Sequence, residues 1–211
     1  MIMKLVERDY EIFREIDRWR FCLGRHIRVL EGFSGQRTCD RRLETLIKAK
    51  YLERRKILYG VPGVYSLTYK AKMLIGANKR QDKMRVERII HDIAVIDTAI
   101  YFAKTAGISF KDITTEKQLH SKNGFSVRNH YPDFIFTKNG RTTCVEVELT
   151  LKSKEKFEKN IRNNFLTYDV QIWAVGTDLR IKAFLNEANA EYPTIKIMDM
   201  EGVKKYVSEL N

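Results

Sequence analysis

The sequence has little of what holds small secreted proteins together. It contains only 3 cysteines and 3 prolines in 211 residues. The cysteines, Cys22, Cys39 and Cys144, are odd in number and lie in apolar-periodic or strand-like contexts, so we expect no disulfide framework. No group of histidines and cysteines has the spacing of a zinc site. These absences favour a reducing compartment, and we expect a cytoplasmic protein.

Long apolar runs are also missing. The first six residues are followed at once by charged ones, so we expect no signal peptide. The longest apolar candidate, residues 89–103, is interrupted by His91, Asp92 and Asp97. We therefore expect a core helix there and no membrane partner. A hydrophobic fraction of 44% is nevertheless enough for packed cores in one large or two small domains.

Positive charge is in excess and unevenly distributed. The chain has 39 Lys and Arg against 27 Asp and Glu, a formal net charge of +12. Residues 1–80 carry +10 of this charge, whereas residues 81–211 carry +2. An excess of this size indicates a polyanionic partner, and the first part of the chain is expected to be the part that docks.

Helical periodicity predicts three helices in the first fifty residues, at 8–21, 23–30 and 36–50. The third turns Cys39, Leu43, Leu46 and Ile47 inward. Its other face is cationic and hydrogen-bonding, as expected of a surface that contacts DNA. The residues predicted to bind DNA on this helix are Gln36, Arg37, Thr38, Arg41, Arg42, Thr45 and Lys48. His26, on the second helix, is expected on the exposed side.

Two short strands are predicted next, at residues 51–55 and 64–68, with a turn at 59–63. The string from Leu43 to Leu52, followed by residues 65–68, resembles the winged helix-turn-helix family. Two positions that are often glycine in that family are Lys50 and Ala71 here. The resemblance implies double-stranded DNA as partner, with the third helix in the major groove and Arg54 and Arg55 on phosphate.

The polar stretch 76–83 has no apolar period, so it is predicted to divide a domain of residues 1–78 from one of residues 79–211. In the second domain the pattern predicts a helix at 84–105, strands at 108–119, 133–136 and 142–149, a helix at 153–165 and strands at 170–175 and 194–198 before a final helix. The fold class expected is α/β (α+β), with a central mixed sheet.

The strands at 133–136 and 142–149 read as a β-hairpin, because Lys138-Asn139-Gly140 between them is a strong turn signal. Alternation along the second strand sends Glu146 and Glu148 to one face. Asp133, at the start of the first strand, can approach both. Clustered carboxylates repel unless they are neutralised, and hard cations such as Mg²⁺ or Mn²⁺ satisfy them.

This spacing carries a second resemblance. Pro132-Asp133, then Glu146-Val147-Glu148 with Lys152 following, is similar to the core motif of the PD-(D/E)XK, or restriction-endonuclease-like, superfamily. The last position of the motif is usually lysine and is Glu148 here. The longer context, residues 115–118 and 145–153, is similar to replication-relaxation proteins of plasmids and conjugative elements, which join a winged helix to such a domain.

The resemblance implies roles for individual residues. Asp133 and Glu146 would be metal ligands, and Glu148 a third ligand or the base that orients water. Lys152, expected at the start of the following helix, would stabilise charge on the phosphate. Glu116, expected on a strand, matches a further carboxylate of the replication-relaxation pattern and would complete the metal site.

Two hypotheses follow from the sequence. The first is a DNA-binding protein of a plasmid or mobile element whose second domain is a metal-dependent endonuclease or nickase in replication, relaxation or mobilisation. The second is a non-enzymatic winged-helix regulator whose second domain serves dimerisation or partner binding. A second copy of the chain, or a relaxase or replication protein, is a candidate partner beside double-stranded DNA.

Overall fold

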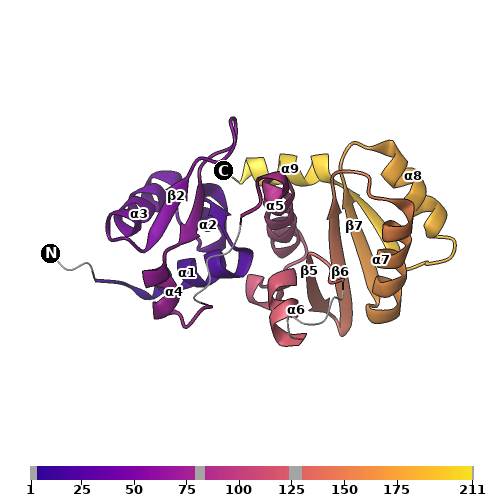
Figure 1. Cartoon of the computed structure of the whole chain (residues 1–211), viewed down its shortest axis with the longest axis horizontal. Helices are drawn as coiled ribbons and strands as arrows, with labels where there is room; N and C mark the ends of the chain where they lie inside the picture. The colour runs from indigo at the N-terminus through magenta and orange to yellow at the C-terminus, as the bar shows by residue number, and fades with distance from the viewer. Residues whose placement is uncertain (1–3, 79–83, 124–129, 211) are drawn as a thin grey trace. The chain divides into compact units, whose positions relative to one another are not determined.

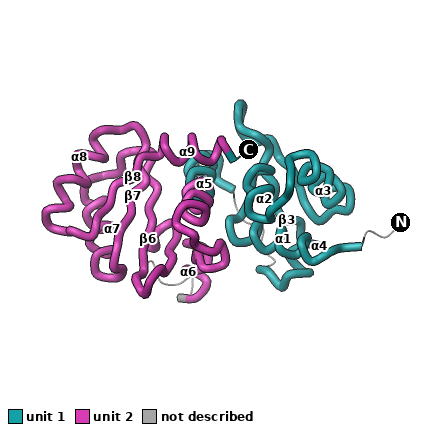
Figure 2. The backbone as a smooth tube through the Cα atoms, turned by 180° about the vertical axis from the view of Figure 1, so that it is seen from behind, with its two compact units in different colours: residues 1–96, 210–211 teal, residues 97–209 magenta. Residues whose placement is uncertain are grey.

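The computed structural model describes residues 4–78, 84–123 and 130–210. The chain divides into two compact units, residues 1–96 with 210–211 (unit 1) and residues 97–209 (unit 2) (Figure 2). This division falls inside helix α5 (Ile89–Thr105), whereas the sequence places it in the stretch 76–83, of which residues 79–83 lie outside the described residues. Over the described ranges, the helices fall short of the length and apolar character that crossing a membrane requires.

Unit 1 combines helices with a small antiparallel sheet (Figure 1). In chain order its elements are α1 (Glu7–Trp19), β1 (Cys22–Leu23), α2 (Gly24–Leu30), α3 (Gln36–Lys48), β2 (Leu52–Arg55), β3 (Val64–Leu67) and α4 (Tyr69–Leu74). The strands are ordered β1-β3-β2. The three predicted helices and two predicted strands are confirmed, whereas β1 and α4 were not predicted.

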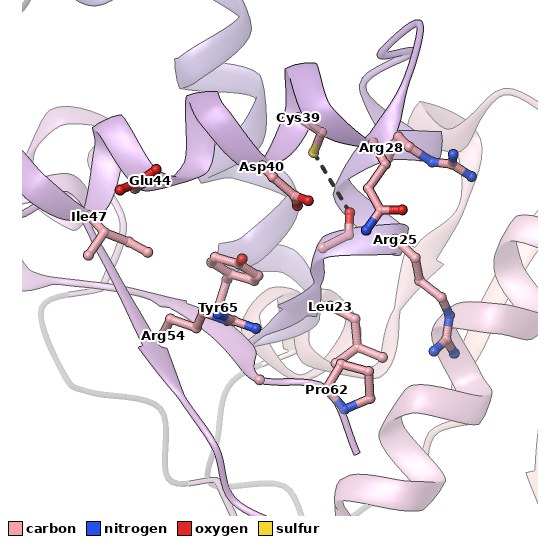
Figure 3. A pocket seen from close by; sticks show the side chains of 13 residues that line it. Leu23, Arg25, Arg28, Cys39, Asp40, Glu44, Ile47, Arg54, Pro62 and Tyr65 are labelled. Atoms are coloured by element: carbon pink, nitrogen blue, oxygen red, sulfur yellow. Dashed lines mark hydrogen bonds between the residues drawn. The ribbon is translucent and has the colours of Figure 1, made fainter. Parts of the chain in front are cut away.

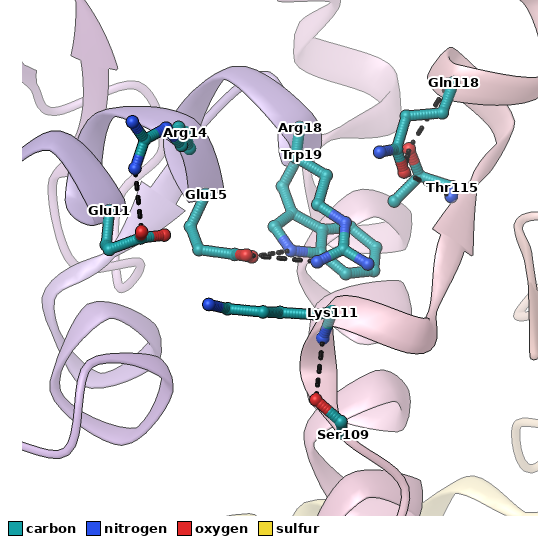
Figure 4. A network of polar contacts seen from close by, with 9 residues as sticks. All are labelled: Glu11, Arg14, Glu15, Arg18, Trp19, Ser109, Lys111, Thr115 and Gln118. Carbon is teal, nitrogen blue, oxygen red and sulfur yellow. Dashed lines mark hydrogen bonds and ion pairs between the residues drawn. The ribbon is translucent and has the colours of Figure 1, made fainter. Parts of the chain in front are cut away.

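Helix α1 is amphipathic, and a carboxylate side chain accepts hydrogen bonds near each of its ends. Ile12, Phe13 and Ile16 are buried on its inner face. At its start the Val6 amide donates to Asp9 Oδ2 at 2.8 Å, which satisfies one of the amides a helix leaves open. Near its end Glu15 accepts from Arg18 Nη1 and from Trp19 Nε1, both at 3.0 Å (Figure 4).

Helix α3 ends in a Schellman motif. The Tyr51 amide donates to the Leu46 carbonyl at 3.0 Å and the Lys50 amide to the Ile47 carbonyl at 2.8 Å. Lys50 adopts a left-handed conformation, with φ of 60°. Glycine is the usual residue at this place in the motif, because it alone has no Cβ penalty there. Lys50 therefore keeps the glycine-like backbone at the position where the sequence departs from the winged-helix pattern.

Unit 2 is built on a mixed sheet of order β4-β5-β6-β7-β8. The strands are β4 (Thr114–Thr115), β5 (Phe134–Lys138), β6 (Arg141–Glu148), β7 (Val170–Val175) and β8 (Ile195–Asp199). β4, β5 and β6 pair antiparallel, and β6, β7 and β8 pair parallel. The helices of unit 2 are the part of α5 from residue 97 onward, α6 (Glu116–Asn123), α7 (Lys154–Thr167), α8 (Leu179–Ala188) and α9 (Met200–Glu209). A short 3-10 turn lies at Phe110–Asp112 in unit 2, and another at Val86–Arg88 belongs to unit 1.

The sheet of unit 2 is covered on both faces. On one face Phe102 of α5 packs against Phe134 and Phe136, with ring centroids 6.3 and 5.4 Å away. On the other face Phe157 of α7 stacks on Trp173 of β7 at 5.0 Å. A sheet that carries parallel strands is normally buried on both sides in this way. The expected α/β class with a central mixed sheet is confirmed.

Several predicted elements of unit 2 are wrong in detail. The expected strand at 108–119 is only β4, and Glu116 begins α6 instead of lying on a strand. Lys152 precedes α7, which begins at Lys154, so it lies in the connection and not on the helix. Helix α8 was not predicted, although its apolar residues Ile181 and Leu185 are fully buried.

Helix α3 is fastened to α1 by an ion pair inside unit 1. The Asp9 side chain is 0% exposed and Arg42 is 27% exposed. Arg42 Nε donates to Asp9 Oδ1 at 2.7 Å, and Arg42 Nη2 also contacts Oδ2. A buried carboxylate is costly without such a partner. This pair therefore fixes the position of α3 on the unit.

Replacing Arg42 with methionine should lower the free energy of unfolding of unit 1 by roughly 2 kcal/mol, because Asp9 would remain buried without its cation. Replacing the exposed neighbour Arg41 with methionine should change it by less than about 0.5 kcal/mol. Urea denaturation followed by circular dichroism measures both. Equal effects of the two substitutions would contradict the structural role of Arg42.

Candidate functional site

The outer face of α3 is the first candidate site. Arg37, Arg41 and Lys48 are exposed, opposite the buried Cys39 and Leu43. Gln36 and Thr38 are also exposed. The Thr45 hydroxyl donates to the Arg41 carbonyl at 2.8 Å, and Lys48 pairs with Glu44 at 2.8 Å. The predicted cationic face is thus formed chiefly by the guanidinium groups of Arg37 and Arg41.

Two sequence expectations in unit 1 need correction. Arg42 was predicted to contact DNA, but its guanidinium is bound to the buried Asp9. His26 was expected on the exposed side of α2, yet it is 0% exposed. Its Nδ1 accepts the Leu23 amide at 3.2 Å and so caps the start of α2. Both side chains belong to the packing of the unit, because each satisfies a buried polar group.

A hollow of about 560 Å³ separates α3 from the β2–β3 hairpin (Figure 3). The residues that line it include Asp40 and Glu44 from α3, Arg25 and Arg28 from α2, and Arg54, Pro62 and Tyr65 from the hairpin. Cations and carboxylates thus face the same space. The arrangement places the hairpin beside α3, with a groove between the two elements.

The arginines of the hairpin are held by its own side chains. The Arg54 guanidinium lies 5.7 Å from the centre of the Tyr65 ring, a cation–π contact. A Cβ at position 63 would come within 2.8 Å of Arg54 Nε, so Gly63 leaves the room this packing needs. Arg55 Nη2 donates to Ser66 Oγ at 3.4 Å. Both predicted phosphate-binding arginines remain exposed at the base of the hairpin.

The second candidate site is the carboxylate cluster on β5 and β6 of unit 2. Asn139 and Gly140 both have positive φ, 51° and 73°, as a tight two-residue hairpin turn requires. The resulting register opposes Phe134 to Val145. Glu146 and Glu148 then point to the face that α7 covers and are 3% and 2% exposed. The predicted sharing of one face is confirmed.

Each of these carboxylates has a partner in the protein. Glu146 Oε1 contacts His130 Nε2 at 2.6 Å and accepts from Asn164 Nδ2 at 3.0 Å. Asp133 Oδ2 accepts the Val147 amide at 2.8 Å. Glu148 forms an ion pair with Lys152. Glu116, by contrast, begins α6 and lies 3.7 Å from His120.

Sequence reasoning missed His130 and Asn164. His130 lies three residues before Asp133, in a segment without apolar periodicity, and offered no signal of its own. Asn164 did offer one, because it falls on the inner face of α7, seven residues after the buried Phe157. A polar side chain on the inner face of an amphipathic helix must find a buried partner, and Glu146 is that partner.

Burial and neighbouring charges shift the pKa values of Glu148 and Lys152. Burial raises the pKa of Glu148; Lys152 lowers it, and Glu146 and Asp133 raise it further. Burial lowers the pKa of Lys152, but its pKa is raised on balance because Glu148, Glu146 and Asp133 surround it with negative charge. Lys152 is therefore held as a cation and partly neutralises the cluster.

The cluster, as arranged, does not fit a divalent cation. Mg²⁺ and Mn²⁺ need carboxylate oxygens free to converge on one point. Here the amide, imidazole and ammonium groups described above each contact one oxygen of Asp133, Glu146 or Glu148. Within residues 4–78, 84–123 and 130–210, no group of three or more His, Cys, Asp or Glu could hold a metal ion. We therefore assign no catalytic step to a metal.

The chain was compared with protein-family models, curated proteins and solved structures, and no match was found.

Replacing Lys152 with methionine should destabilise the protein by about 2 kcal/mol at pH 7.5, because Glu148 would stay charged and buried without its partner. The pKa of Glu148 is already raised and should rise further, so the loss should shrink at pH 5 as the carboxyl takes up a proton. The midpoint of urea denaturation at the two pH values measures this difference.

A double variant is the matched control. Lys152→Met combined with Glu148→Gln has no charge at either position, so its destabilisation relative to the parent should vary much less between pH 5 and pH 7.5. A loss in Lys152→Met of the same size at both pH values would show that the Glu148 charge does not cause it.

Proposed function

We propose that the protein binds double-stranded DNA through unit 1, used as a winged helix-turn-helix. The element order of unit 1 and its β1-β3-β2 sheet support this identification. In this fold the helix corresponding to α3 enters the major groove and the hairpin contacts the backbone beside it. The groove between α3 and the hairpin is consistent with two elements that engage DNA at neighbouring points.

The observation that carries the proposal is the exposed face of α3. Arg37 and Arg41 lie one turn apart on this face, and their guanidinium groups can reach guanine edges or phosphates. Arg54 and Arg55 then lie in reach of the flanking backbone. The net charge of +10 on residues 1–80 adds an attraction that does not depend on base sequence.

The biological setting is proposed from the family resemblance. A protein that joins a winged helix to a nuclease-like domain would act on the DNA of a plasmid or mobile element, in the cytoplasm. A second copy of the chain, or a relaxase or replication protein, would be its protein partner. A dimer would bind two half-sites about one helical turn apart.

For unit 2 we propose a role without DNA cleavage, as a partner-binding or dimerisation module. The support is that Asp133, Glu146 and Glu148 each have one oxygen in contact with a group of the protein itself. The alternative is a PD-(D/E)XK nuclease that uses Mg²⁺ or Mn²⁺. It is favoured by the electrostatic coupling of the three carboxylates to Lys152 on one face of the sheet.

Replacing Arg37 and Arg41 together with alanine should weaken binding to duplex DNA about 10- to 100-fold at 0.1 M salt. It should also reduce the slope of log affinity against log salt by about 1 to 2, because each arginine that neutralises a phosphate adds about 1 to that slope. Fluorescence anisotropy with a labelled duplex, before and after selection of a preferred sequence, measures both.

The control for that experiment is Lys204→Ala with Lys205→Ala, which removes the same charge from the exposed face of α9. This variant should bind DNA like the parent. Equal loss in the two double variants would show that net charge, and not the face of α3, determines binding.

Supercoiled plasmid incubated with the protein and Mg²⁺ or Mn²⁺ should remain uncut under the module proposal. The same incubation with Asp133→Ala/Glu146→Ala, after its fold and DNA affinity have been checked, should give the same result. Nicking by the parent that disappears in the variant, measured on agarose gels, would establish the nuclease and overturn the module.

A further inference from the structure

A groove of about 750 Å³ lies between helices α7 and α8 of unit 2 (Figure 1). Ile161 of α7 and Phe184 and Ala188 of α8 line it. All three also belong to the buried cluster around Trp173, or pack against it, so both helices cover the same face of the sheet. The groove is therefore an apolar surface that continues the core of unit 2 outward to solvent.

Leu166, near the end of α7, also lines this groove. It is 71% exposed, whereas the ring of its neighbour Phe165 packs edge-on against Tyr192 at 5.3 Å. A leucine in water gives up the stabilisation that burial would bring. An apolar groove with an exposed leucine and a charged rim is typical of a surface that binds another protein.

The charges around the groove are almost balanced. Among the described residues that line it, three are cationic and four are acidic. Lys159 and Arg162 lie on α7, whereas Glu187 lies on α8 and Glu191 just after it, and all four are exposed. The remaining three lie near the start of α7. The second half of the α7 wall is therefore cationic, and the α8 wall is acidic.

This balance of charge indicates what binds in the groove. DNA is not favoured, because four carboxylates would face its phosphates. Two copies of a chain with a net charge of +12 repel one another, so they associate best where opposite charges compensate. A second copy brings cations to the acidic wall of the groove and carboxylates to the cationic wall. It is therefore the partner whose charge fits.

The spacing of the groove residues fits a two-fold arrangement of the two copies. The residues of interest span seven positions on α7 and seven positions on and just after α8. When α7 of one copy lies antiparallel to α8 of another, their residues pair as follows: Leu166 with Phe184, Arg162 with Glu187, and Lys159 with Glu191. A two-fold axis makes each of these contacts twice, because both copies present the same surface.

We propose that the groove between α7 and α8 is the surface through which two copies of the chain form a two-fold dimer. Leu166 of each copy enters the groove of the other, and Arg162 of each copy pairs with Glu187 of the other. This inference rests on the role proposed for unit 2 and adds to it the surface and the partner.

A charge swap tests the pairing by sedimentation velocity of the full chain without DNA, over a range of protein concentrations. Arg162→Glu and Glu187→Arg should each raise the dissociation constant of the dimer about 100-fold, because like charges then meet at two symmetric contacts. An equal mixture of the two variants should dimerise within about threefold of the parent, since both contacts of a mixed pair again join opposite charges.

Matched controls separate the groove from net charge and from exposed leucines in general. Lys205→Glu makes the same charge change as Arg162→Glu at an exposed position of α9 and should dimerise like the parent. Leu166→Ala should raise the dissociation constant about tenfold, because the apolar contact is lost. Leu179→Ala, at the start of α8 and 75% exposed, should leave it unchanged. Unchanged midpoints of urea denaturation would exclude misfolding, as expected for exposed side chains.

The outcomes separate the dimer surface from the role proposed for unit 2. A parent that sediments as a monomer up to its solubility limit overturns the inference. A parent dimer that survives Arg162→Glu or Glu187→Arg also overturns it, because the contact then lies elsewhere. Two monomeric variants whose mixture stays monomeric contradict the two-fold pairing. Nicking of supercoiled plasmid by the parent would instead overturn the role without cleavage, and the sedimentation results decide the dimer surface separately.

Discussion

A carboxylate that is removed from water must be compensated, and this constraint shapes both units. In unit 1 it binds Arg42 of α3 to the buried Asp9 of α1. In unit 2 it places His130 and Asn164 around Glu146 and keeps Lys152 beside Glu148. Arg42, His130 and Asn164 come from other elements or segments than the carboxylates they contact. Lys152 comes from the segment that follows the strand of Glu148. The buried acids therefore determine which elements meet, as well as how the charge is balanced.

Much of the fold could be predicted because it depends on local pattern. The stripe of Cys39, Leu43 and Leu46 identified α3, and Asn139-Gly140 identified the β5–β6 hairpin. The failures have equally local causes. Glu116 follows a β-branched pair, Thr114-Thr115, which reads as a continuing strand, but the strand ends there. The Thr115 amide instead donates to Gln118 Oε1 at 2.9 Å, which favours a helical turn at that point (Figure 4).

For the candidate sites, the sequence predicted which residues share one face of a strand or helix, but not the groups that these residues contact. Strand alternation predicted that Glu146 and Glu148 share a face, and helical spacing predicted the same of Arg37 and Arg41. Both predictions were possible because side chains repeat every 2 residues in a strand and about every 3.6 residues in a helix. The partners of these residues could not be predicted, since Asp9 and Arg42 are 33 residues apart and Glu146 and Asn164 are 18 apart. Such pairings depend on how elements pack.

The parallel pairing in unit 2 also bears on the order in which the chain folds. β6 can pair with β7 only after the ribosome has synthesised α7, which lies between these strands in the chain. Thr98 of α5 contacts Met200 of α9, which lies 102 residues further along. The paired strands of unit 1 all lie between residues 22 and 67. Closing long loops slows folding, and domains generally fold as units from the N-terminus during synthesis. We therefore expect the helices and hairpin of unit 1 to assemble on the ribosome before the sheet of unit 2 is complete.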